Sequence, residues 1–225
     1  MSEKENKLGT LEEGQVRITN PFGPTVAWSR IPSSLVDKLN NYIDKIIEDK
    51  EKSSLLDHGK NLAGDVSQEF KLENKFSDEI GWTEFLRKNV ATWIYYSTEK
   101  KIKKFELLST WVVRQFKGEY NPIHWHGGHV SGAGYLLLPK TFGTPVQKEA
   151  KSSNSNGHIE LVHGNRQFLS NSKLNIKPEV GNFYFFPHYM MHTVYPFTGT
   201  DEERRSISFN AKVDNEIFDV YAGEK

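Results

Sequence analysis

The spacing of apolar residues indicates a helical first half of the chain. Over residues 34–47, apolar side chains recur at every third or fourth position behind a serine, which predicts an amphipathic helix with a serine cap. A second stripe of this kind predicts a helix from Trp82 to about Lys101. The residues expected on its buried side are Trp82, Phe85, Leu86, Val90, Trp93 and Ile94. We interpret these aromatic side chains as core residues rather than as a binding site.

From Phe105 onward the pattern changes to short runs rich in β-branched and aromatic residues, separated by Gly, Pro and Asn. The runs predicted to be strands are 105–116, 130–138, 158–162, 182–187, 192–196 and 204–213. Several short strands at this spacing are typical of a sandwich or a barrel. We therefore expect a mainly β protein of the α+β kind, a double-stranded β-helix (jelly roll) with supporting N-terminal helices.

The length of 225 residues is sufficient to bury a substantial core, and no internal repeat is visible, so we expect one domain over 1–225. Its expected parts are a flexible tail over 1–15, a helical buttress over 30–103 and a jelly-roll catalytic core over 105–215. The polar segment 59–70 is a surface loop in the simpler interpretation and a substrate lid in the other. Residues 148–156, rich in Lys, Ser and Asn, are expected to form a mobile loop near the mouth of the site.

Composition excludes several classes of function. Lys and Arg together number 29, as do Asp and Glu, so no overall field attracts nucleic acid or an anionic membrane. The absence of cysteine excludes disulfides, thiolate metal ligands and cysteine nucleophiles. The charged segment 1–7 leads to no apolar core, and no apolar stretch has the length of a membrane span, so we predict a cytoplasmic protein.

Three histidines form the strongest chemical signal. His124 and His126 stand directly before a glycine-rich bend and a strand-like run. Side chains two positions apart on a strand share a face, so both imidazoles can bind one metal ion. His192, just beyond the apolar run 183–187, offers a third imidazole. The sequence therefore predicts a metal site.

Other histidines leave alternatives open. His129 could replace His126 as a ligand, because two glycines separate them and a bend there could turn either side chain inward. His188 stands four positions before His192, a metal spacing on a helix, but Pro187 argues against a helix through both. We expect His188 to contact a ligand or to lie at the surface. The histidines expected to be ordinary polar positions are His58, His158 and His163.

An arginine follows the third histidine by twelve positions. Period-2 alternation places Arg204, Ser206 and Ser208 on one face of this run, and Ile207 and Phe209 on the other. Two histidines and a third group on one side of Fe(II) leave positions open for a chelating co-substrate and oxygen. Guanidinium presents a planar fork suited to a carboxylate, and a serine hydroxyl can complete that anchor. The order of these residues indicates an iron site with an anionic co-substrate.

One further arginine of this run and three residues earlier in the chain have less specific expected roles. Arg205 is expected on the opposite face from Arg204, leaving the strand near its end for solvent. Trp111, Arg114 and Trp125 could line a substrate cavity, although we expect packing to be the first role of the two tryptophans.

Five segments together resemble the 2-oxoglutarate/Fe(II) oxygenases of the prolyl-hydroxylase-like superfamily. They are 118–126, 131–139, 157–161, 181–192 and 204–210, in the expected order over roughly the second half of the chain. More narrowly, they resemble the subgroup that reads His-x-His where most members read His-x-Asp or His-x-Glu. By this resemblance His124 is the first metal ligand, His126 takes the position usually held by a carboxylate, and His192 is the distal histidine.

The resemblance also implies the co-substrate and the activity. Arg204 with Ser206 would anchor the distal carboxylate of 2-oxoglutarate, and Tyr135 matches a tyrosine that contacts the same carboxylate in some relatives. The cofactor would be Fe(II), with no catalytic residue beyond the metal centre. The activity would be a dioxygenase that hydroxylates a small-molecule or peptide substrate, with release of succinate and CO2. Neither a membrane nor a nucleic acid is indicated as a partner.

Two other functions are kept as alternatives. A cupin-type three-histidine dioxygenase needs no keto acid and would leave Arg204 without a carboxylate to bind. A non-catalytic jelly-roll binding module would keep the fold, while the histidines serve packing or a structural metal.

Overall fold

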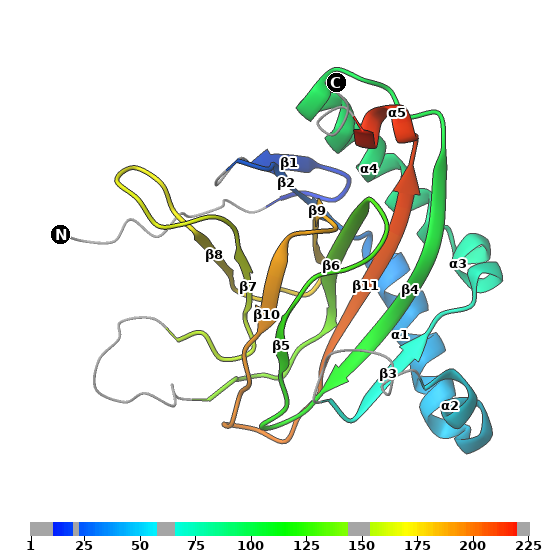
Figure 1. Cartoon of the computed structure of the whole chain (residues 1–225). Coiled ribbons are helices and arrows are strands. Elements are labelled where there is room, and N and C mark those ends of the chain that lie inside the picture. The colour runs from blue at the N-terminus through cyan, green and yellow to red at the C-terminus, as the bar shows by residue number, and fades with distance from the viewer. Residues whose placement is uncertain (1–10, 20–22, 58–65, 144–153, 220–225) are drawn as a thin grey trace.

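Two antiparallel sheets form the body of the protein (Figure 1). The computed structural model describes residues 11–19, 23–57, 66–143 and 154–219, and within these ranges the major sheet has seven strands and the minor sheet four. In spatial order, the major sheet consists of β1 (Val16–Thr19), β2 (Val26–Arg30), β9 (Asn182–Pro187), β6 (Val130–Leu137), β11 (Arg204–Val213), β4 (Phe105–Gln115) and β3 (Gln68–Lys71). The minor sheet consists of β5 (Asn121–His124), β10 (Met191–Val194), β7 (Ile159–Val162) and β8 (Lys173–Ile176).

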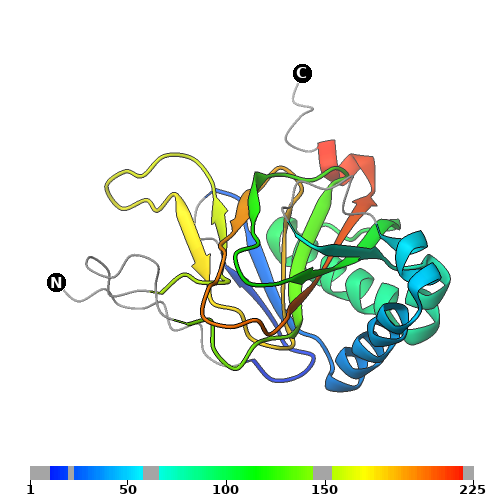
Figure 2. The ribbon, with the colours of Figure 1, turned by 90° about the horizontal axis from the view of Figure 1, so that it is seen from below.

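Helices cover the outer face of the major sheet (Figure 2). The helices are α1 (Ser33–Glu48), α2 (Lys50–Leu56), α3 (Asn74–Ile80), α4 (Trp82–Thr98) and the short α5 (Asn215–Phe218). Leu39 and Ile43 of α1 and Trp82 and Leu86 of α4 are fully buried against the sheet. Burying an aliphatic or aromatic side chain of this size stabilises the fold by about 1.5 to 3 kcal/mol, which explains why the two helices stay on this face.

Strand alternation divides the core in two. On β9, Phe183 and Phe185 join the core beneath the helices, whereas Tyr184 and Phe186 face the interior between the two sheets. Gly134 makes this packing possible, since a Cβ there would lie 2.3 Å from the ring of Phe183. The interior between the sheets is thus a separate compartment, in which a site can form without disturbing the helical core.

The predicted fold class, mainly β with a jelly roll and supporting helices, is confirmed. All six predicted strands are present with ends within two residues, and the helix predicted over 34–47 is α1. The second predicted helix is α4, which ends three residues earlier than expected, where Glu99 takes a left-handed φ of 60°. The elements that the pattern did not predict are β1, β2, β3, β5, β8, α2, α3 and α5.

Some local predictions were wrong. No serine caps α1, because its N-cap is Pro32 and no side-chain cap bond forms. Residues 59–65 of the proposed lid lie outside the described residues, but Gln68–Lys71 is an edge strand paired with β4 rather than loop. Leu11, within the expected flexible tail, is buried in the core between the sheets. Residues 1–10 and 148–153, where the rest of the tail and most of the mobile loop were predicted, lie outside the described residues.

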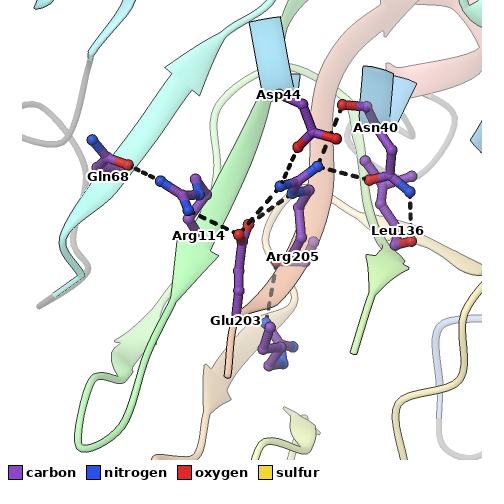
Figure 3. A network of polar contacts seen from close by, with 9 residues as sticks. Asn40, Asp44, Gln68, Arg114, Leu136, Glu203 and Arg205 are labelled. Carbon is purple, nitrogen blue, oxygen red and sulfur yellow. Dashed lines mark hydrogen bonds and ion pairs between the residues drawn. The ribbon is translucent and has the colours of Figure 1, made fainter. Parts of the chain in front are cut away.

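Arg205 was expected to reach solvent, and that prediction was wrong: the side chain is 3% exposed. Its guanidinium donates to Glu203 at 2.7 Å and to Asp44 of α1 at 2.8 Å (Figure 3). Arg114 of β4 also binds Glu203, at 2.9 Å, and it contacts Gln68 of β3. Strand alternation directs the Arg205 side chain toward the face of the major sheet that the helices cover, where it cannot reach solvent. Its charge is neutralised by acidic groups instead.

We expect Arg205→Met to lower the free energy of unfolding by about 3 kcal/mol, the lower end of the cost of breaking a buried ion pair, because Arg114 remains beside Glu203. The control is Asp44→Asn, whose side chain is 55% exposed and whose loss should cost less than about 1 kcal/mol. Urea unfolding curves measure both. Equal, small losses in the two variants would show that this network contributes little to stability.

Candidate active site

Three imidazoles converge in the interior between the sheets. His124 ends β5 and is the direct cross-strand partner of His192 on β10. His126 lies two residues beyond the end of β5, held by its backbone N–H, which donates to the carbonyl of His188 at 3.0 Å. One ring nitrogen from each of His124, His126 and His192 lies within 4.8 Å of the others. The three side chains predicted to form a metal site are therefore brought together, although His126 is not on a strand.

Hydrogen bonds orient two of these rings. Nδ1 of His124 lies 2.6 Å from the carbonyl oxygen of Pro122, and Nδ1 of His192 lies 2.9 Å from that of Met190. A carbonyl oxygen only accepts, so in both rings Nδ1 carries the proton and donates. In both rings Nε2 is consequently the unprotonated nitrogen, and this is the arrangement in which imidazoles bind metals.

The protonation state also suits metal binding. Burial, followed by the charges of the neighbouring imidazoles, lowers the pKa of His126 to about 3, and burial with the charge of His124 lowers that of His192 to about 4. Burial lowers the pKa of His124 as well. All three rings are thus neutral near pH 7, and only the neutral form can be a ligand.

The spacing of the nitrogens fits a metal ion. Nε2 of His126 and Nε2 of His192 are 3.0 Å apart. Two nitrogens at a right angle around one ion, each bonded at about 2.1 Å, would be about 3.0 Å apart. Among the described residues, no carboxylate belongs to this group. Three neutral imidazoles would leave a divalent ion its full charge of about +2, so an anionic co-ligand would be strongly attracted.

Arg204 supplies the second half of the site. It is 2% exposed, its Nε donates to the carbonyl of Gly157 at 3.0 Å, and its Nη1 donates to Ser206 Oγ at 3.2 Å. Its guanidinium carbon lies 5.0 Å from the ring centre of Tyr135, which faces Ser206 across β6 and β11. Within the described part of the chain Arg204 has no acidic partner, and the Tyr135 hydroxyl has no hydrogen-bond partner. Since buried charges and polar atoms are normally paired, this cluster suits an anionic ligand.

A single cavity of about 230 Å³ joins the two halves. Its walls include all three histidines, Arg204, Ser206 and Glu69. Trp111 and Trp125, named from the sequence as cavity candidates, also line it, whereas Arg114 is engaged with Glu203 on the opposite face of β4. Glu69 was not recognised from the sequence, because β3 has four residues and its mixed composition carries no detectable period.

The remaining histidines lie elsewhere. His129 accepts a hydrogen bond from the Val213 N–H at 3.1 Å and stacks on Phe218, with ring centres 3.9 Å apart, so the alternative that His129 replaces His126 does not fit the geometry. His188 contacts the backbone of His126, its Nδ1 lying 3.1 Å from that carbonyl oxygen. His158 is bonded to Asn175. His58 lies outside the described residues.

Comparison with known proteins agrees with this arrangement. Residues 109–210, just under half of the chain, match the model of a family described as "Putative 2OG-Fe(II) oxygenase". The matched segment begins in β4, ends in β11 and contains the three histidines, Tyr135, Arg204 and Ser206. No curated protein matches the chain in sequence. No helix in the described part of the chain is both long and apolar enough to cross a membrane.

Solved structures show the same fold. The viral collagen prolyl hydroxylase of Paramecium bursaria Chlorella virus-1, in its 2OG complex, is 16% identical with a TM-score of 0.50; the alignment covers 88% of this chain and 96% of that one. The non-haem α-ketoglutarate-dependent epimerase SnoN from nogalamycin biosynthesis is 14% identical with a TM-score of 0.51; the alignment covers 82% and 76%. At these identities the likeness concerns the fold alone.

Fold and site together define an enzyme class, the non-haem Fe(II) oxygenases that use 2-oxoglutarate. Residues 109–210 match the model of the 2OG-Fe(II) oxygenase family, whose members use Fe(II) as cofactor and 2-oxoglutarate as co-substrate. The residues present fit both groups: a cluster of neutral imidazoles for the ion, and, for the carboxylate, a buried guanidinium that forms no ion pair in the described ranges.

Proposed function

We propose that the protein is a 2-oxoglutarate-dependent dioxygenase that hydroxylates a small-molecule or peptide substrate and releases succinate and CO2. His124, His126 and His192 hold the iron, and Arg204, Ser206 and Tyr135 bind the distal carboxylate of 2-oxoglutarate. Residues 105–215 form the catalytic core, and 30–103 support it. One observation carries the proposal: a buried arginine that has no acidic partner among the described residues shares one cavity with three neutral imidazoles.

The chain's own residues act by binding and positioning. Arg204 and Ser206 fix one end of 2-oxoglutarate, and the Tyr135 hydroxyl, unpartnered among the described residues, can donate to the same carboxylate. The apolar walls Val113, Ile159 and Val194 limit water in the cavity. When bound, iron couples oxidation of a substrate C–H bond by O2 to oxidative decarboxylation of 2-oxoglutarate, so that one oxygen atom enters the alcohol and the other enters succinate.

The two alternatives explain fewer of these features. A three-histidine dioxygenase without a keto acid would use the imidazoles but would leave Arg204 buried and unpaired, at a cost of several kcal/mol. A binding module without catalysis could use the histidines for packing or a structural metal, but it would leave the buried guanidinium of Arg204, in the same cavity, without a carboxylate to bind.

Succinate formation tests the proposal. With Fe(II), ascorbate and 2-oxoglutarate under air, the wild-type protein should form succinate slowly even without substrate, and His124→Ala/His192→Ala should form none above the protein-free background. X-ray absorption of the metal-loaded wild type should show imidazole nitrogens at about 2.0 to 2.1 Å. The matched control is His129→Ala, outside the cluster, which should keep its metal. Metal content that is unchanged in the double variant would refute the assignment of the ligands.

A further inference from the structure

Glu69 is a buried carboxyl group, one oxygen of which has no hydrogen-bond partner in the described part of the chain. Its side chain is almost fully buried, with the residue 1% exposed, and Oε2 has no hydrogen-bond partner among the described residues. Strand alternation determines where it points. Phe70 of β3 belongs to the core beneath the helices, so Glu69 faces the opposite way, into the cavity that the three histidines line.

Glu69 stands in a row with the co-substrate residues. It pairs with Val113 of β4, Val113 pairs with Ser206 of β11, and Ser206 pairs with Tyr135 of β6. With strands about 4.8 Å apart, Glu69 lies two strands, or about 10 Å, from the serine of the carboxylate anchor. It does not belong to the group of metal-ligating atoms. The cavity therefore has a cationic end at Arg204 and a separate acidic group at Glu69.

The chemistry at Glu69 differs from that of a structural carboxylate. Burial, followed by the charge of Asp57, raises the pKa of Glu69 to about 7. A carboxyl group in this state gains strongly from a nearby cation, because the cation both neutralises the charge and supplies the missing hydrogen bond. It would repel 2-oxoglutarate, a dianion. The group that reaches Glu69 must therefore be something other than the co-substrate.

Aromatic rings complete the surroundings. Trp111 precedes Val113 by two residues on β4, so the two side chains lie on the same face of the strand. Both line the cavity. Trp125 also lines it and is 64% exposed, which places it at the rim. Indole faces attract ammonium and guanidinium groups, by about 0.5 to 2 kcal/mol each. A buried carboxyl group and two tryptophans in one cavity are the combination that recognises a cationic nitrogen.

We propose that Glu69 is a specificity-determining residue that binds a positively charged amine or guanidine group of the substrate, with Trp111 and Trp125 beside it. The inference rests on the proposed function, since it assigns the substrate to the cavity that would hold iron and 2-oxoglutarate. It narrows the substrate class to molecules that carry an ammonium or guanidinium group, such as a basic amino acid side chain, free or within a peptide, or a polyamine.

The test compares cations with neutral molecules of the same shape. Tryptophan fluorescence is followed while lysine, arginine, their N-acetyl amides and spermidine are titrated into the full-length protein, first without metal and then with Zn(II) and 2-oxoglutarate. Norleucine and citrulline are the uncharged counterparts. Wild type should bind at least one cation ten or more times more tightly than its neutral counterpart. Glu69→Gln should lose most of that preference, and Glu69→Asp should recover part of it.

Control variants keep the outcomes distinct. Glu106→Gln removes the same charge from an exposed position on β4 and should leave the preference intact. Circular dichroism establishes that each variant is folded. The proposal is overturned if every cation binds like its neutral counterpart, if no cation binds at all, or if Glu69→Gln keeps the preference. The metal-free titration needs no turnover. A lack of succinate formation would therefore refute the proposed function without deciding whether Glu69 binds a cation.

Discussion

Arg204→Lys is expected to weaken 2-oxoglutarate binding by tenfold or more, although the charge is kept. Nε and Nη1 of Arg204 already donate to Gly157 and Ser206, which fixes the guanidinium plane and leaves its remaining N–H groups for the carboxylate. An ammonium has a single donor centre and cannot make both sets of contacts. Losing one hydrogen bond to a charged group costs about 1.5 to 3 kcal/mol, which corresponds to a factor of about 10 to 150 in affinity.

Calorimetric titration of 2-oxoglutarate into the Zn(II)-loaded protein measures this loss. Arg205→Lys is the matched control, because the neighbouring arginine points to the opposite face and binds Asp44 and Glu203. Its affinity for 2-oxoglutarate should stay within about twofold of wild type, since the Arg205 guanidinium lies on the other face of the sheet and shares no partner with that of Arg204. If the two variants lost affinity equally, the carboxylate anchor would have to lie elsewhere.

The strand that carries both arginines was predictable because its two faces differ chemically. On β11, Ile207 and Phe209 alternate with Ser206 and Ser208. This contrast shows from the sequence alone which side chains share a face of the strand. The same alternation placed Arg205 correctly opposite Arg204. It could not show that Arg205 is buried, because its partner Asp44 lies 161 positions away in the chain and reaches it only through the packing of α1 on the sheet.

Short elements account for most of the features that could not be predicted from the sequence. β3 and β5 have four residues each, too few for a periodic pattern to stand out from chance, and β5 also contains Pro122. Glu69 was missed for this reason. The convergence of His126 with His124 was predicted from strand spacing, but the chain achieves it beyond the strand, through a backbone contact with His188 that no local pattern indicates.

The His126 position leads to the second large expected effect: wild type should bind Fe(II) weakly alone and clearly more tightly with 2-oxoglutarate. Two imidazoles and a carboxylate leave a site charge of about +1, whereas three neutral imidazoles leave about +2, with less attraction to hold the ion. The pKa of His126, lowered to about 3, keeps its ring neutral. The dianionic co-substrate then supplies the missing negative charge, so the two ligands should couple by about 1 to 3 kcal/mol.

By linkage, each ligand must tighten the other by the same factor, and this reciprocity can be tested with variants. His126→Asp should retain Fe(II) better than wild type in the absence of 2-oxoglutarate and show weaker coupling, provided that the shorter carboxylate reaches the ion. His126→Ala should lose most metal affinity, while His129→Ala should behave like wild type, because its ring is occupied by Val213 and Phe218. Anaerobic Fe(II) titrations of the four proteins, each with and without 2-oxoglutarate, measure both affinities. Unchanged iron affinity and turnover in His126→Ala would remove this residue from the ligand set, and the attraction between iron and co-substrate would then need another origin.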